Sequence, residues 1–155
     1  MSVSLLIVPF AITMISIAAD HVGSIIENKL AASQNTGEPC VIETRFVDKD
    51  LLCKTLQEHG LDIVVVNENT IRSQCKDSSI VFSRNVSSEP FSLTISSAAE
   101  IEALRNELKE INEEYGMNVQ SYTYNHVKNS LDEGMSVSSE EVLEDNSILL
   151  TITLD

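Results

Sequence analysis

Basic residues are scarce in this sequence. Its 155 residues include 10 Lys and Arg against 24 Asp and Glu, which gives a formal net charge of −14 at pH 7. A surface this negative repels phosphate groups, so the composition argues against nucleic acid as a partner. It would suit a basic protein partner, but an acidic surface that serves only solubility is the favoured interpretation. The hydrophobic fraction of 43% is sufficient for a folded core and too high for a disordered chain.

Residues that mark catalytic or cofactor sites are also few. The three cysteines, Cys40, Cys53 and Cys75, form no close pair, which argues against a disulfide framework and for a reducing compartment. The five glycines are not clustered, so the sequence has no glycine-rich phosphate loop. The serine-hydrolase and zinc-protease motifs are missing, and the acidic residues lack EF-hand spacing. We therefore predict no metal ion, no cofactor and no catalytic residue.

The apolar run at residues 3–19 lacks the basic residues that a secretory signal has near Met1. It ends at Asp20, short of the ~20 apolar residues of a membrane-spanning helix. Its polar residues recur at helical spacing on one stripe: Thr13, Ser16, Asp20, Ser24 and Glu27. This pattern favours a helix over residues 1–30 that packs within the protein or forms oligomers. A membrane anchor and a cleaved signal remain alternatives.

The interacting face predicted for this helix is apolar and consists of Leu6, Phe10, Ile12, Ile15 and Ile17. An exposed apolar helix of this kind needs a partner surface, because large apolar patches are rare on soluble monomers. Residues 31–39, AASQNTGEP, predict a polar linker. The folded domain is therefore expected over residues 40–155.

Strands with alternating polarity and two amphipathic helices make up the predicted domain. We expect strands at 40–47, 62–66, 70–75, 79–83, 91–95, 135–143 and 148–154, and helices at 49–59 and within 98–134. Asp48 is the expected N-cap of the first helix, and Gly60 is expected to end it. The order β-α-β-β-β-β-α-β-β predicts an α+β fold, a mainly antiparallel sheet with helices on one face, preceded by the apolar N-terminal helix.

The second helix carries an apolar stripe at steps of three and four, which includes Ile101, Leu104, Leu108, Ile111 and Tyr115. An unbroken helix over the whole pattern would be about 50 Å long, more than one small domain accommodates. We therefore expect a kink or break at Gly116 and the helix end at Gly134. Residues 144–147 have the composition of the turn between the last two strands.

The tail from Tyr122-Thr-Tyr124-Asn-His126 through Gly134 and an acidic strand to Glu144-Asp145-Asn146-Ser147-Ile148 resembles the C-terminal half of a known family. That family consists of conserved reading frames of plastids, cyanobacteria and other bacteria, and it has no established activity. The resemblance covers about the last quarter of the chain. This sequence differs from the family in having Asn146 where the family has glycine and in its apolar N-terminal extension. The resemblance implies a fold and a non-enzymatic role beside partner proteins such as AAA+ ATPases, and it transfers no catalytic residue.

Tyr122, Tyr124 and His126 are the candidate ligand-binding residues. Tyr122 and His126 lie one helical turn apart, and tyrosine with histidine can bind a ligand or transfer a proton. The alternative interpretation places them at the rim of the core, with their polar tips in water. The function we expect is a non-catalytic adaptor or assembly subunit in the cytoplasm that acts through protein–protein contacts. The alternatives are a membrane-anchored small domain and a ligand or enzyme site around Tyr122 and His126.

Overall fold

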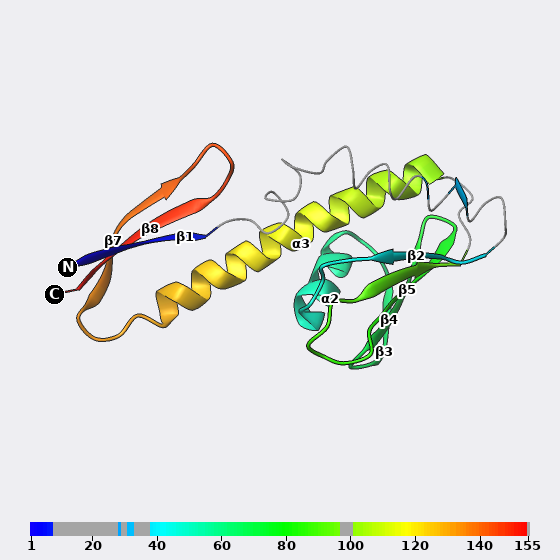
Figure 1. The fold of residues 1–155 in the computed structure, drawn as a ribbon, viewed down its shortest axis with the longest axis horizontal. Coiled ribbons are helices and arrows are strands. Elements are labelled where there is room, and N and C mark those ends of the chain that lie inside the picture. Colours follow the sequence, from blue (N-terminus) through cyan, green and yellow to red (C-terminus); the bar gives the residue numbers. More distant parts are fainter. Residues whose placement is uncertain (8–27, 29–30, 33–37, 97–100, 155) are drawn as a thin grey trace. The chain divides into compact units, whose positions relative to one another are not determined.

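The fold is α+β, with two antiparallel sheets and two helices whose full bounds are described, in a computed structural model that describes residues 1–7, 28, 31–32, 38–96 and 101–154 (Figure 1). The helices are α2 (Lys49–Glu58) and α3 (Ile101–Asn129). The strands are β1 (Ser2–Ile7), β2 (Cys40–Glu43), β3 (Ile63–Asn67), β4 (Thr70–Cys75), β5 (Ser78–Ser83), β6 (Ser92–Ile95), β7 (Met135–Val142) and β8 (Ile148–Leu154).

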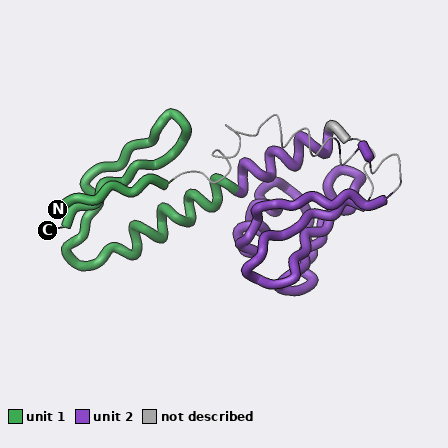
Figure 2. The backbone as a smooth tube through the Cα atoms, viewed as in Figure 1, with its two compact units in different colours: residues 1–17, 116–155 green, residues 18–115 purple. Residues whose placement is uncertain are grey.

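The chain divides into two compact units, one of residues 1–17 with 116–155 and one of residues 18–115 (Figure 2). This division differs from the predicted segments 1–30, 31–39 and 40–155. Residues 2–7 belong with the C-terminal part of the chain, and the predicted domain over 40–155 falls into two parts. Each unit has its own sheet.

The unit of residues 18–115 contains a five-stranded sheet in the order β2-β6-β5-β4-β3, with every neighbouring pair antiparallel. Alternate residues of its strands are buried, so one face of the sheet forms the core. The helices contribute Leu52, Leu56, Leu104, Leu108 and Ile111 to the buried set. Phe46 connects the sheet to α3. The centroid of its ring lies 6.0 Å from that of Phe82 in β5 and 4.6 Å from that of Tyr115 in α3.

Helix α2 begins and ends as the sequence predicts. The Asp48 side chain accepts a hydrogen bond of 2.9 Å from the Leu51 N–H, which satisfies one of the free donors of the first turn. At the other end Gly60 has a φ of +87°, and the Leu61 N–H donates back to the Leu56 carbonyl over 2.9 Å. Glycine adopts this left-handed backbone conformation without strain, which explains why the helix ends at this position.

Helix α3 continues through Gly116, so the predicted break at this residue is wrong. The boundary between the two units falls between Tyr115 and Gly116. A break was expected because so long a helix does not fit within one small domain, but the two halves of α3 belong to different units. The predicted end at Gly134 is also wrong, because α3 ends at Asn129 and Gly134 has a φ of +88° in the turn before β7. Ser130 and Asp132 follow, and side chains of these types compete with helical backbone hydrogen bonds.

The other unit contains a three-stranded sheet in the order β1-β8-β7. Strand β1 pairs antiparallel with β8, from Ser2 opposite Thr153 to Ile7 opposite Ile148. The prediction of a helix over residues 1–30 is therefore wrong for residues 2–7. This short segment is compatible with a strand, and it pairs with the edge of β8 that β7 leaves open. Leu6 lies on β1 with half its surface exposed. The other predicted interaction residues, Phe10, Ile12, Ile15 and Ile17, lie outside the described residues.

The β7–β8 hairpin turns at residues 144–147, as predicted. The Leu143 N–H donates to the Ser147 carbonyl over 2.8 Å, and the Asp145 carboxylate accepts from the Ser147 N–H over 2.9 Å. Asn146 has a φ of +62°, and asparagine is the residue after glycine that best tolerates this conformation. The Gln120 amide of α3 donates to the Asn146 carbonyl over 2.7 Å, which fixes the turn to the helix.

The Tyr115 hydroxyl gives a first test of the core. It accepts hydrogen bonds from the N–H groups of Val47 and Asp48, each over 3.1 Å. Tyr115→Phe leaves both donors without this acceptor and should lower the free energy of unfolding by about 1–3 kcal/mol in urea denaturation. Tyr122→Phe, at a residue 57% exposed, is the control and should stay within about 0.5 kcal/mol of the parent protein. Equal unfolding midpoints for all three proteins would contradict the assignment.

The conformation of Asn146 gives a second test. Asn146→Val should lower the free energy of unfolding by about 1–2 kcal/mol, because a β-branched residue is strained at positive φ. Asn146→Gly should keep or raise stability, since glycine adopts this conformation freely. Urea denaturation of the two variants distinguishes a backbone effect, which predicts opposite outcomes, from loss of the asparagine side chain, which predicts the same outcome.

Candidate functional site

The predicted ligand-binding residues on α3 do not converge. The rings of Tyr122 and His126 stack, with centroids 6.1 Å apart and planes 3° from parallel, and both side chains are exposed. Tyr124 is engaged elsewhere, because its hydroxyl donates to the Glu140 carboxylate of β7 over 2.7 Å and accepts from the Lys128 ammonium over 2.8 Å. Tyr124 therefore ties α3 to β7, and only the exposed Tyr122–His126 pair remains of the predicted site.

The outer edge of β3 is an apolar surface that the sequence analysis did not single out. β3 is the last strand of the five-stranded sheet, and within the described residues it pairs only with β4. Three consecutive valines on it are exposed: Val64 (63%), Val65 (47%) and Val66 (47%). Their sequence predicted a strand, but it did not show that the strand lies at an edge.

Strand β3 itself lacks the charged side chains by which proteins often protect exposed strands. The edge strand β7 carries the exposed carboxylates Glu140 and Glu141, whereas Ile63 to Asn67 of β3 carry no charge. The pairing register shifts between Val65 and Asn67, which indicates a bulge. Free backbone groups beside exposed apolar side chains form a template on which another extended segment can pair.

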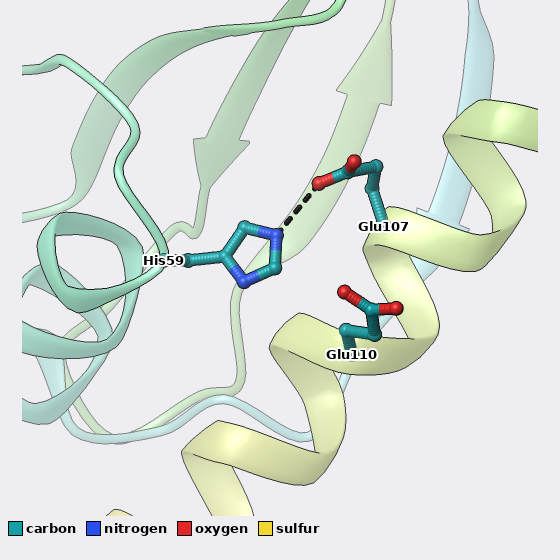
Figure 3. A group of neighbouring side chains, drawn as sticks. All are labelled: His59, Glu107 and Glu110. Atoms are coloured by element: carbon teal, nitrogen blue, oxygen red, sulfur yellow. Dashed lines mark hydrogen bonds and ion pairs between the residues drawn. The ribbon is translucent and has the colours of Figure 1, made fainter.

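A second feature is a histidine held between carboxylates in the unit of residues 18–115. His59 is the C-cap of α2, and its ring reaches the acidic residues of α3 (Figure 3). Its Nε2 lies 2.6 Å from Glu107 Oε2, and its Nδ1 lies 3.0 Å from Glu114 Oε2. Glu107, Glu110 and Glu114 recur at steps of three and four, which places them on one stripe of the helix.

The charges of this cluster act on one another. Burial favours the neutral ring of His59, but the hydrogen bonds to Glu107 and Glu114 outweigh it and raise the pKa of His59 above its ordinary value. The Lys76 ammonium lies 2.6 Å from Glu107 Oε1, and its hydrogen bond, together with that of His59, holds the pKa of Glu107 below its usual range. In its charged form, His59 therefore links the end of α2 to α3.

The same cluster can hold a cation. One ligand atom each from His59, Glu107 and Glu110 can be chosen so that all lie within 4.8 Å of one another. The sequence predicted only a capping role for His59 and no metal ligand at all. The sequence feature that could have indicated this cluster is the acidic pair Glu107 and Glu114 beside the apolar stripe of α3. The sequence did not show that the end of α2 packs against it.

Comparison of the chain with protein-family models, curated proteins and solved structures finds no match. Function therefore has to be argued from this chain's own geometry. None of the three cysteines forms a disulfide, and Cys40 and Cys75 are buried. Among the described residues, no helix has the length and apolar character needed to cross a membrane.

The His59 cluster predicts a specific dependence of stability on pH. Because the pKa of His59 is higher in the folded than in the unfolded protein, its contribution is fully present below the unfolded value of about 6.5 and is lost as pH rises through the folded value. His59→Gln should therefore cost more stability at pH 6 than at pH 9, measured by urea denaturation with EDTA present. His126→Gln, whose ring stacks on Tyr122, is the matched control. A cost for His59→Gln that is constant or grows with pH would contradict this account.

Proposed function

We propose that this chain is a non-catalytic adaptor or assembly subunit, and that the edge of β3 binds an extended segment of a basic partner protein. The observation that carries the proposal is the run of exposed valines, Val64 to Val66, on an edge strand without charge. A segment that pairs with such an edge extends the sheet by one strand. Main-chain hydrogen bonds supply the affinity in this mode, and side chains supply the specificity.

The apolar contribution supports an interface of moderate strength. Complete burial of a valine side chain stabilises by about 1.5–3 kcal/mol, and the three valines are roughly half exposed. Each therefore adds about 1 kcal/mol when a partner strand covers it. Ordering of the partner segment opposes this gain, so an adaptor that binds and releases fits the numbers better than a permanent complex.

Charge complementarity supports a basic partner. The exposed residues Asp62 and Glu68 flank the apolar strand, and the whole chain carries a formal net charge of −14. Glu68 also pairs with Lys49 over 2.7 Å, which leaves Asp62 as the more available carboxylate. A segment with an apolar centre and lysine or arginine at its ends matches this pattern, and the net charge accelerates its encounter with the chain.

Other routes to protein contacts remain predictions. The oligomer-forming segment containing Phe10, Ile12, Ile15 and Ile17 lies outside the described residues. The AAA+ ATPase partner rests on the family resemblance of the tail, and membrane anchoring rests on the same apolar segment. A deletion of residues 1–30 would also remove β1 from its sheet, so a truncation test should retain residues 1–7.

A synthetic peptide tests strand addition directly. The probe alternates valine and threonine and has lysines at both ends, and its binding is followed by fluorescence anisotropy. The full chain should bind it, and Val64→Lys should weaken binding about tenfold or more, because the new charge repels the probe and caps the edge. Val41→Lys is the matched control, since Val41 is similarly exposed and lies on β2, at the other end of the strand order among the described residues.

A second probe separates strand pairing from simple charge attraction. The same peptide with alternate backbone nitrogens methylated keeps its charge but cannot complete the ladder of hydrogen bonds, so it should bind much more weakly. Equal binding of the two peptides, or equal effects of Val64→Lys and Val41→Lys, would rule out the β3 edge. Light scattering adds one outcome: a dimer abolished by Val64→Lys would identify a second copy of this chain, instead of a basic partner, as the occupant.

A further inference from the structure

We infer that His59, Glu107 and Glu110 form a binding site for a divalent first-row transition-metal cation of the zinc type. The site is independent of the proposed strand-addition surface. One nitrogen and two carboxylate oxygens come from two elements, the end of α2 and one turn of α3. Figure 3 shows both carboxylates on the side of α3 that faces the imidazole ring.

The dimensions of the cluster fit a tetrahedral cation. Zinc binds histidine nitrogen and carboxylate oxygen at about 2.0–2.2 Å, which places neighbouring ligand atoms roughly 3.4 Å apart. The present Nε2–Oε2 distance between His59 and Glu107 is 2.6 Å, and all three candidate ligand atoms lie within 4.8 Å of one another. Insertion of the cation therefore requires side-chain adjustments of about 1 Å or a little more, which rotation of the glutamate side chains can supply.

Glu114 is the positioning residue for the imidazole ring. It accepts a hydrogen bond from Nδ1 over 3.0 Å and so holds a proton on that nitrogen, which means that a cation would take the place of the proton by which Nε2 bonds Glu107 in the metal-free chain. Histidine ligands of metal ions commonly have such a carboxylate on their second nitrogen, which fixes the ring and increases its basicity. The side chain of His59 is only 9% exposed, so the ring is already held in place before a cation binds.

The local charge favours a divalent ion. Glu107, Glu110 and Glu114 face the ring from α3, and Lys76 faces Glu107 from the turn between β4 and β5. With a neutral ring, three carboxylates and one ammonium leave two negative charges, which a divalent cation cancels. The imidazole ligand selects zinc, nickel or copper over magnesium and calcium, which prefer sites made only of oxygen. Glu110 is exposed and provides the open side through which the ion enters.

The test uses the tag-free full chain, stripped with EDTA and exchanged into chelator-free buffer at constant pH. Zinc chloride is then titrated by calorimetry and in thermal unfolding. The parent chain should show saturable binding and a melting temperature that rises with zinc concentration. Glu110→Gln should weaken the affinity about tenfold or more and leave the metal-free melting temperature unchanged, because Glu110 is exposed. Glu43→Gln, an exposed residue of β2, makes the same change of charge and should bind zinc like the parent chain.

Three results would overturn the assignment. The first is the absence of saturable binding by the parent chain. The second is equal zinc affinity in Glu110→Gln and Glu43→Gln, which would mean that the ion responds only to overall charge. The third uses cobalt(II) as a spectroscopic probe: a thiolate charge-transfer band would place the ion on the free cysteines instead. A cobalt spectrum without that band, lost in His59→Gln, supports the site.

Discussion

Burial of the apolar stripe of α3 is the constraint on which the structure depends. In the unit of residues 18–115 the stripe supplies Leu104, Leu108, Ile111 and Tyr115, all buried, and each buried aliphatic side chain stabilises by about 1.5–3 kcal/mol. Beyond Gly116 the helix uses different means. Gln120 and Tyr124 bind a turn carbonyl and a strand carboxylate, so polar contacts connect the second half of the helix to the β7–β8 hairpin. One helix thus serves two sheets by two kinds of interaction.

The shortage of basic residues determines where charges can be satisfied. With 10 Lys and Arg for 24 acids, most carboxylates cannot have a basic side chain of their own. Glu107 pairs with both Lys76 and His59, and Glu114 pairs with His59. A histidine at this position acts as a basic residue because its neighbours favour the charged ring. The same shortage leaves an excess of negative charge, and both the proposed metal ion and the proposed basic partner segment depend on that excess.

Local features of the fold were predictable because they depend on neighbouring residues. The cap at Asp48, the glycine end at Gly60 and the turn at 144–147 each follow from short-range backbone chemistry, and all three are present. The errors involve contacts between distant segments. Strand β1 depends on a partner near the other end of the chain, and the continuity of α3 through Gly116 depends on the division into two units.

The candidate site shows the same limit. His59 and Glu107 are far apart in sequence, and no spacing rule connects the end of one helix to the stripe of another. The exposure of Val64 depends on β3 being the outermost strand, which is a property of sheet order. Tyr122 and Tyr124, in contrast, were proposed from local spacing, and their interactions diverge because residues two positions apart point to different sides of a helix.

The pairing of β1 with β8 imposes an order of events on a chain made from its N-terminus. Residues 2–7 are synthesised long before Ile148–Leu154, the strand with which they pair. Until then Val3, Leu5 and Leu6 have no native sheet to join, and such long-range closure is slow and prone to mispairing. The unit of residues 18–115 has all its strands much earlier. The β1–β8 pairing is therefore completed after the strands of the five-stranded sheet have all been synthesised.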